Sequence, residues 1–426
     1  MTDDTSRPDD GVHAAAGRAV AAVWRIESAR IVATLTRVTG DFALAEDLAQ
    51  DALAEALKQW PDAGVPANPA AWLTAVAKRR AIDTWRRRER YDDRLAVIAH
   101  DLEREQTESA YAAPWDPDAI DDDVLRLIFI ACHPVLSREA QVALTLRVVG
   151  GLSSEEIGRA FLVPVGTVQQ RIVRAKKTLG AASVPFELPP REEHGQRLAA
   201  VLGVLYLIFN EAHTASSGED WMRPDLGREA TRLTRSLASL LPREPEVHGL
   251  LALMELTAAR FPARTDAQGE PVLLGDQDRT RWDRSAIRRG RAALARVDAL
   301  GRGRGGYALQ ASIAECHAVA ASVEDTDWDR IVLLYEALGQ LTPSPVIELN
   351  KAAAVAMATG PASALRIIDR LMASGELRGY HLLPATRGEL LLRLGRDDEA
   401  RAEFAAAARL AGNDRERALL SQKARG

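Results

Sequence analysis

The sequence has 426 residues but only two cysteines, Cys132 and Cys316, which lie far apart along the chain. Cysteines placed in this way form neither a zinc-ligand pattern nor a disulfide framework, and this favours a reducing compartment. No run approaches the roughly 18 apolar residues that a membrane-spanning helix needs. The polar, acidic start MTDDTSRPDDGVH does not resemble a signal peptide. We therefore expect a cytoplasmic protein that makes no membrane contact.

Aromatic residues are also scarce, at 5%, and the formal net charge is only −5. Because Ala, Leu and Arg dominate the composition, helix is favoured over strand. The apolar fraction of 47% is high enough for buried cores, and the length indicates two to four domains. We predict an all-α fold. Since the overall charge is nearly balanced, any contact with nucleic acid must come from local basic patches.

Changes in composition divide the chain into five segments. We expect a disordered tail over 1–17, a helical domain over 18–91, a linker over 92–120, a second helical domain over 121–182 and a long helical domain over 183–426. The linker mixes proline and acidic residues without a clear period, and the prolines of SVPFELPPREEHG mark the last boundary.

The last segment looks repetitive. In LPATRGELLLRLGRDDEARAEFAAAARLAG, the residues Gly388, Ala400 and Phe404 have tetratricopeptide-like (TPR-like) spacing. Weaker copies align Ile331 and Ala364 with Ala400, at spacings close to the 34 residues of stacked helical hairpins. A generic α-helical bundle is the alternative. Stacks of this kind mostly bind proteins or peptides, so we expect a protein ligand for this domain.

The stretch GLSSEEIGRAFLVPVGTVQQRIVRAKKTLG predicts a helix-turn-helix. Gly150 and Gly151 end the preceding helix, and Ser153 with Glu156 forms a capping box for the first helix of the motif. Pro164 suits the first turn of the second helix.

The second helix of this motif has two contrasting sides. Its buried stripe is predicted to be Val168, Ile172, Ala175 and Leu179. The other side offers hydrogen-bond donors for base edges and charges for phosphates, as a helix in the major groove requires. Its residues are Thr167, Gln170, Arg171, Arg174 and Lys177. The alternative interpretation is an ordinary solvated basic face.

Two helices of opposite charge precede this motif. The first, Gly40–Pro61, is predicted to bury Leu44, Leu48, Leu53, Leu57 and Trp60, and to expose an acidic side that suits a basic protein partner. That side consists of Asp41, Glu46, Asp47, Asp51 and Glu55. The second helix, AWLTAVAKRRAIDTWRRRER, is strongly basic.

This pair, followed by a linker and a helix-turn-helix, resembles the extracytoplasmic-function (ECF) sigma factors of bacterial RNA polymerase. AEDLAQDALAEAL is similar to their region 2.2, AWLTAVAKRRAIDTWRR to regions 2.3 and 2.4, and GLSSEEIGRAFLVPVGTVQQRIVRAKKTL to region 4.2. The remaining residues resemble the TPR-like extension of one subgroup of this family.

The resemblance implies a role for each charged surface. The acidic helix would dock on the β′ clamp of core polymerase through Asp41, Glu46, Asp47, Gln50 and Asp51, and region 4 would contact the β flap. The −10 promoter element would be held by Asn68, Trp72, Arg79, Arg80, Trp85, Arg86 and Arg87. Core packing is the favoured alternative for both tryptophans. The −35 element would be read by Thr167, Gln170, Arg171, Arg174 and Lys177.

The resemblance implies neither catalysis nor a cofactor. GRGRGG over 301–306 reads as a turn, and the short motifs NEAH and ECH lack the partners of a metal site. A one-component regulator, with a helix-turn-helix and a helical sensor domain, is the main alternative function. This alternative does not explain the acidic and basic helices over 40–90. A scaffold that binds acidic proteins is a third alternative.

Overall fold

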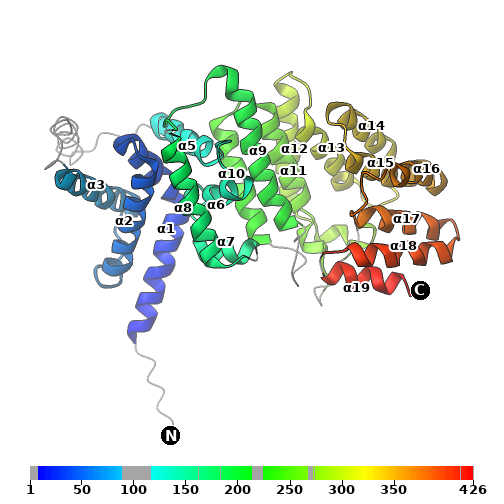
Figure 1. The fold of residues 1–426 in the computed structure, drawn as a ribbon, viewed down its shortest axis with the longest axis horizontal. Helices are drawn as coiled ribbons and strands as arrows, with labels where there is room; N and C mark the ends of the chain where they lie inside the picture. The colour runs from blue at the N-terminus through cyan, green and yellow to red at the C-terminus, as the bar shows by residue number, and fades with distance from the viewer. Residues whose placement is uncertain are drawn as a thin grey trace, which may run out of the picture. The chain divides into compact units, whose positions relative to one another are not determined.

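The structure is a computed structural model that describes residues 8–88, 117–161, 163–182, 184–213, 224–266, 272, 274–412 and 414–425. Over these residues the fold is all-α, as predicted (Figure 1). The chain divides into two compact units, Met1–Val204 and Leu205–Gly426. Each helix in the described ranges is too short or too polar to cross a lipid bilayer.

The N-terminal unit begins with three helices: α1 (Pro8–Thr39), α2 (Phe42–Ala63) and α3 (Pro69–Arg88). The first helix packs on both of the others, and its residues Trp24, Ile31 and Leu35 are buried. Helix α1 starts at Pro8, whereas the sequence predicted a disordered tail over 1–17. The expected tail is therefore helical from Pro8 onward, and residues 1–7 lie outside the described residues.

Five further helices follow: α5 (Pro117–Ala131), α6 (Arg138–Val148), α7 (Ser154–Phe161), α8 (Val165–Ala181) and α9 (Arg191–His213). Helix α5 packs on α1 and α6, and α8 packs on α6, α7 and α2. Most of the expected linker, 92–116, lies outside the described residues. Helix α5 already begins at Pro117, inside the range that was expected to be linker.

The boundary between the two units falls later than the sequence suggested. Arg197 of α9 donates a hydrogen bond to the Phe129 carbonyl oxygen at 3.1 Å, and the His194 ring lies 5.8 Å from the ring of Phe129. These contacts tie the first part of α9 to α5. The prolines before α9 break the helix, as predicted near residue 183, but residues up to Val204 still belong to the N-terminal unit.

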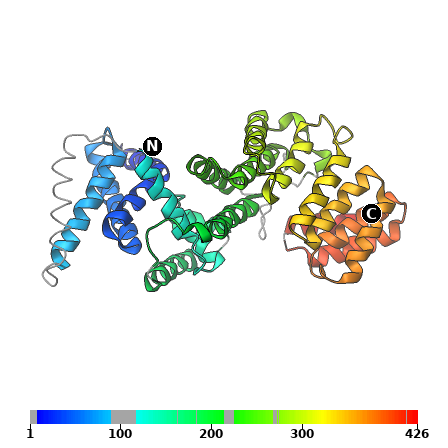
Figure 2. The same ribbon diagram turned by 90° about the horizontal axis from the view of Figure 1, so that it is seen from above.

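The C-terminal unit is a stack of helices in which each helix packs on the next along the chain. It contains α10 (Pro224–Leu240), α11 (Pro245–Ala258), α12 (Arg284–Ala299), α13 (Gly306–Val319), α14 (Trp328–Leu341), α15 (Pro345–Ala358), α16 (Pro361–Ser374), α17 (Leu382–Arg393), α18 (Asp397–Leu410) and α19 (Asp414–Lys423). Three 3-10 turns, Phe261–Ala263, Leu274–Asp276 and Arg279–Arg281, lie between α11 and α12. Figure 2 shows the yellow-to-red helices of this unit lying side by side.

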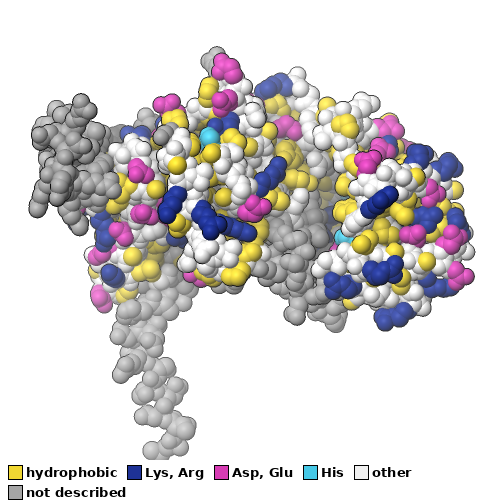
Figure 3. All heavy atoms as spheres, in the orientation of Figure 1, with side chains coloured by type: hydrophobic (Ala, Val, Ile, Leu, Met, Phe, Trp, Pro, Cys, Tyr) yellow, Lys and Arg dark blue, Asp and Glu magenta, His cyan; other side chains and the backbone are white. Residues whose placement is uncertain are grey.

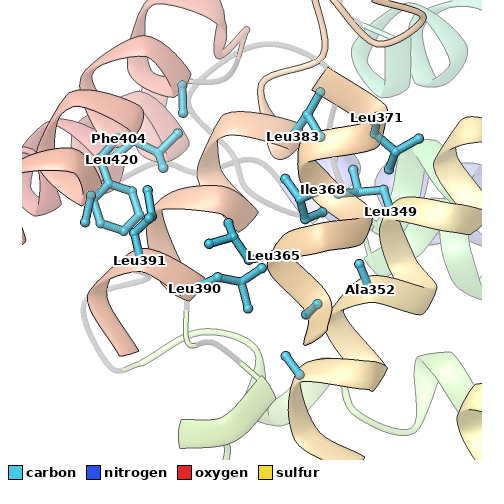
Figure 4. Packing of buried hydrophobic residues seen from close by; sticks show 14 of the residues in the cluster. Leu349, Ala352, Leu365, Ile368, Leu371, Leu383, Leu390, Leu391, Phe404 and Leu420 are labelled. Carbon is cyan, nitrogen blue, oxygen red and sulfur yellow. The ribbon is translucent and has the colours of Figure 1, made fainter. Parts of the chain in front are cut away.

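The helical hairpins repeat as the sequence spacing predicted. Ile331, Ala364 and Ala400 are each the fourth residue of their helix, in α14, α16 and α18, and all three are buried. Gly388 of α17 faces Phe404 of α18 so closely that an added Cβ would lie 2.9 Å from the Phe404 ring. Figure 4 shows Phe404 among the buried leucines of α17 and α19. A small residue thus lets one helix approach its neighbour while an aromatic ring fills the space between them.

The surface of this unit is charged but mixed in sign. On the face shown in Figure 3, dark-blue Lys and Arg side chains alternate with magenta Asp and Glu side chains over the C-terminal helices. Arg387 illustrates the pattern, because it bonds Asp369 at 3.0 Å and Glu403 at 2.6 Å. This face therefore does not carry the single-sign patch that binding to a nucleic-acid backbone requires.

Candidate polymerase and promoter interface

Helix α2 presents its acidic residues differently from the sequence prediction. Asp47 and Asp51 are exposed and Gln50 is half-buried, whereas Asp41 caps the helix by accepting hydrogen bonds from the Ala43 and Leu44 backbone amides. Glu46 was predicted on the exposed side, and this was wrong, because only 3% of it is exposed.

The apolar side of α2 also needs a correction. Leu57 was predicted to be buried but is 48% exposed, and Leu44 and Leu53 are only partly buried. The buried side is made mainly of small residues, Ala45, Ala49, Ala52 and Ala56, with Leu48 and Trp60. Alanines let α1 approach α2 closely, so the contact face is rotated away from the line of leucines.

Glu46 is buried because residues of α6 and α8 cover it. Lys176 of α8 donates to Glu46 Oε2 and, at 2.8 Å, to Asp47 Oδ1. Arg147 of α6 donates from Nε to Glu46 Oε1 at 3.4 Å. Burial would lower the pKa of Lys176, but the two carboxylates outweigh it and raise that pKa, so the ammonium stays charged. An ion-pair cluster therefore joins α2 to α8 inside the N-terminal unit.

A second contact joins α1 to the helix-turn-helix. Arg25 pairs with Glu156 at 2.5 Å, and Arg37 pairs with the buried Asp123 of α5 at 2.9 Å. Gly151, just before α7, has a φ of +69°. A Cβ at Gly151 would lie 2.7 Å from Ser28 Oγ and 3.1 Å from the Arg25 Cα atom. Glycine is thus required here twice, for the left-handed backbone and for the approach of α1.

Replacing Gly151 with alanine should destabilise the N-terminal unit by about 3 kcal/mol, from the left-handed backbone and the clash with α1 together. Gly166→Ala is the matched control, because Gly166 lies in α8 with no atom within 4 Å of an added Cβ. That change should stabilise the helix by up to about 1 kcal/mol. Urea denaturation followed by circular dichroism compares the two variants, and equal stabilities would contradict the predicted contact.

The helix-turn-helix has the predicted local structure. The Ser153 amide donates to Glu156 Oε2 at 2.8 Å, and the Glu156 amide donates to Ser153 Oγ at 3.1 Å, which confirms the capping box. The buried residues of α8 are the predicted stripe: Val168, Ile172, Ala175 and Leu179. Gly158 was missed by the sequence analysis. A Cβ there would lie 2.9 Å from the Val163 carbonyl oxygen, so glycine permits the tight turn.

The opposite side of α8 faces outward from this stripe. Gln170, Arg174 and Lys177 are exposed, and Thr167 and Arg171 are half-buried. These five residues, predicted from sequence as the −35 contacts, share one helix and one side of it. Lys176 lies beside the buried stripe, away from this face, and is the residue that reaches Glu46 and Asp47.

The predicted −10 residues are in varied environments. Arg79 is exposed, but Arg80 is held by two acids of α2, Asp51 at 3.2 Å and Glu55 at 2.7 Å. A hydrogen bond from Gln59 and the charges of Arg80 and Lys58 lower the pKa of Glu55. Part of the basic helix is thereby neutralised by the acidic one.

Two further −10 candidates also have structural roles. Asn68 accepts a hydrogen bond from the Ala71 amide at 3.1 Å and so caps α3, although its side chain stays exposed. Trp72 packs edge-on against the buried Trp60, with ring centroids 5.6 Å apart, which agrees with the core-packing alternative. The side chains of Trp85, Arg86 and Arg87 lie outside the described residues.

No group of three or more His, Cys, Asp or Glu side chains in the described ranges could hold a metal ion. The Cys132 thiol is buried, and burial raises its pKa to about 12, so it stays protonated and unreactive.

Comparison with known proteins assigns two helical regions of the N-terminal unit to a protein family. Residues 25–91 match the family described as Sigma-70 region 2, and residues 126–179 match Sigma-70, region 4. Residues 197–298 match a family of unknown function, DUF6596. The chain therefore contains the two DNA-binding regions of the sigma-70 family, which imply binding to core RNA polymerase and to promoter DNA. Sigma factors are not enzymes.

The similar proteins agree with this class. Uncharacterized protein R00370 of Rhizobium meliloti is 44% identical over 391 residues, which cover 91% of this chain and 90% of that protein. The chain belongs to the same family as R00370. RNA polymerase sigma-H factor of Pseudomonas aeruginosa is 29% identical over 158 residues, covering 37% of this chain and 82% of that protein. Probable ECF RNA polymerase sigma factor SigI of Mycobacterium tuberculosis is 26% identical over 177 residues, or 41% of this chain and 58% of SigI.

Proposed function

We propose that this protein is an alternative sigma factor of the ECF type, which binds core RNA polymerase and directs it to a particular set of promoters. The observation that carries the proposal is the presence of sigma-70 regions 2 and 4, in that order, in one chain. The acidic side of α2 would dock on the β′ clamp, and region 4 would contact the β flap. The exposed side of α8 would read the −35 element, and α3 with the preceding loop would hold the −10 element.

The charges of the N-terminal unit support these separate roles for α2 and α8. Asp47 and Asp51 are exposed acids on α2, while Arg174 and Lys177 are exposed bases on α8. The acids suit a basic protein surface and would repel DNA, whereas the bases suit phosphates. Glu46 is covered by Lys176 in this structure. Docking through Glu46 therefore requires α8 to move away from α2 first.

The proposal is tested by run-off transcription with purified core polymerase and a promoter from the operon of this protein. A sigma factor confers specific initiation on core polymerase, whereas a one-component regulator binds duplex DNA alone and does not. A scaffold does neither. Arg174→Ala should weaken promoter binding and reduce its salt dependence. Arg79→Ala should impair strand opening. Absence of both polymerase binding and run-off product would refute the proposal.

We further propose that the C-terminal unit is a TPR-like domain that binds a protein ligand and modulates promoter firing. The repeated hairpins α13–α14, α15–α16 and α17–α18 support it, because stacked hairpins present extended surfaces to proteins.

Removing this unit should abolish or deregulate promoter firing. The truncation is best made after His213, which keeps α9 and its contacts with Phe129 and so protects the N-terminal unit. Run-off transcription by the truncated and the full-length chain is compared with equal amounts of core polymerase. Identical, normally regulated output from both chains would contradict a regulatory role.

A further inference from the structure

The C-terminal unit contains a cavity that the proposed function does not use. Its volume is about 720 Å³, and residues of α11, α13, α14 and α15 line it together with Tyr206. A second cavity of about 470 Å³ shares Leu274, His317, Tyr335 and Asn350 with the first, so the two adjoin. Volumes of this size are typical of sites for small molecules.

The first cavity has an unpaired positive charge on its wall. Arg260 lies just after α11, and within the described parts of the chain no carboxylate pairs with its guanidinium. Glu246 also lines the cavity, but it accepts hydrogen bonds from the Tyr307 and Ala308 amides at 2.8 and 3.3 Å and thus caps α13. Arg260 therefore faces the cavity without a counter-ion.

Nearby positive charge destabilises the charged form of Arg260. Arg279 donates to the carbonyl oxygens of His317 and Ala320 at 2.7 and 2.9 Å. The charges of Glu324 and Asp325 act on Arg279 and partly balance its own charge. Burial, together with the charge of Arg279, lowers the pKa of Arg260 to about 10. Burial, together with the charge of Arg260, lowers that of Arg264 to about 9. An anion in the cavity would stabilise the charge of Arg260.

His317, another residue that lines the cavity, has a buried polar atom without a partner. His317 Nδ1 is buried and makes no hydrogen bond, and the ring packs edge-on against Trp328 with centroids 5.2 Å apart. Burial and the charges of Arg260 and Arg279 lower the pKa of His317 to about 4, so the ring is neutral near pH 7. A buried nitrogen without a partner is unfavourable unless a ligand supplies one.

The rest of the cavity is mainly apolar and aromatic. Leu253, Ile313, Leu338 and Ile347 form apolar walls. Tyr206 and Tyr307 meet edge-on with ring centroids 5.4 Å apart, and the Tyr206 hydroxyl donates to Gln310 at 3.2 Å. Since one guanidinium is unpaired and the histidine is neutral, the site offers a single positive charge beside an apolar volume. This combination suits a monoanion with an apolar body rather than a phosphate group.

We propose that this cavity binds a small organic carboxylate, whose carboxylate pairs with Arg260 and hydrogen-bonds His317, and whose apolar body packs against Ile313, Leu338 and Ile347. The site lies entirely within the C-terminal unit. Its occupancy is independent of polymerase and DNA, so the proposed transcription function and this binding site can fail separately.

The test uses the full-length chain and fluorine NMR with three probes: 4-fluorophenylacetate, 4-fluorobenzoate and 8-fluorooctanoate. At least one should show line broadening at millimolar concentration, and its neutral amide should show none. Arg260→Gln should weaken binding at least about tenfold, because a charge-assisted hydrogen bond is lost. His317→Phe should weaken it as well. Arg284→Gln, on the exposed start of α12 and outside the cavity lining, should bind as the unaltered protein does.

Melting temperatures separate a binding defect from a folding defect. The bound carboxylate should raise the melting temperature of the unaltered protein but not that of Arg260→Gln. Without ligand, Arg260→Gln should melt no lower than the unaltered chain, since Arg260 has no acid to lose. The proposal is overturned by absence of binding for all three probes, by equal binding of the amides, by displacement with inorganic phosphate at lower concentration, or by a ligand-free Arg260→Gln variant that melts early.

Discussion

Replacing Lys176 with methionine should destabilise the N-terminal unit by about 3 kcal/mol, because it leaves the buried Glu46 carboxylate without its main partner. The methionine keeps the length and apolar stem of the lysine, so packing changes little. Arg147 stays 3.4 Å from Glu46, which limits the loss. Urea denaturation monitored by circular dichroism measures the change in the free energy of unfolding.

Lys177→Met is the matched control for this prediction. Lys177 is the next residue of α8, and it is exposed, whereas the Lys176 side chain is only 13% exposed. Removing Lys177 should change stability by less than about 0.5 kcal/mol. Adding Glu46→Gln to the Lys176→Met variant should recover part of the lost stability, since no buried charge then remains. Equal effects of the two lysine substitutions would show that the pair with Glu46 is not buried in solution.

The same substitution should act on polymerase binding in the opposite direction. If α2 docks on the β′ clamp, the cluster around Lys176 competes with that docking for Glu46 and Asp47. Lys176→Met should therefore bind core polymerase more tightly than the unaltered chain, while it folds less stably. Titration of labelled core polymerase measures the affinity. Weaker binding by Lys176→Met would mean that the cluster does not compete with docking.

Replacing Phe404 with alanine should cost about 4 kcal/mol, because it leaves a cavity between α17, α18 and α19, within the core that α15 to α19 share. Phe404 is 2% exposed and its ring fills the space left by Gly388. The loss should appear as increased amide hydrogen exchange over these three helices. Helices α11 to α13 have a separate buried cluster around Trp282 and Leu294 and should keep their protection.

Leu410→Ala controls for the loss of an apolar side chain from the same helix. Leu410 lies in α18 but is 45% exposed, so its removal should cost less than about 1 kcal/mol. Gly388→Ala offers a second check. It should destabilise the unaltered chain, in which the added methyl meets the Phe404 ring, and cost much less in the Phe404→Ala background. Additive effects of the two substitutions would contradict direct packing between them.

The Phe404→Ala variant also bears on the proposed regulation. It should loosen the last hairpin while the first helices of the C-terminal unit stay folded. If promoter firing by this variant resembles that of the chain truncated after His213, the last hairpins carry the regulatory contact. If it resembles that of the full-length chain, the contact lies in the earlier helices.

Local features of this protein were readable from its sequence. The capping box of Ser153 and Glu156, the buried stripe of α8 and the repeated position of Ile331, Ala364 and Ala400 all appear as predicted. Each depends on residues within one or two neighbouring helices, where the helical period and the capping chemistry fix the arrangement.

Other features were predicted wrongly because an amphipathic pattern does not show which other helix packs against it. In α2 the leucines dominate the apolar pattern, and the alanines add little to it. The alanines nevertheless form the contact with α1, and Leu57 was therefore wrongly predicted to be buried. The boundary near residue 183 was read from prolines, which end helices but say nothing of how α9 packs on Phe129.

The sequence by itself determined the all-α class, the order of an acidic helix, a basic helix and a helix-turn-helix, and the spacing of the C-terminal hairpins. Only the tertiary structure decided that Lys176 covers Glu46 across 130 residues of chain, that Gly151 meets Ser28, and that Arg260 and His317 line the same cavity. The reason is physical. Periodicity and capping act over a few residues, whereas these contacts depend on which faces of distant helices bury one another.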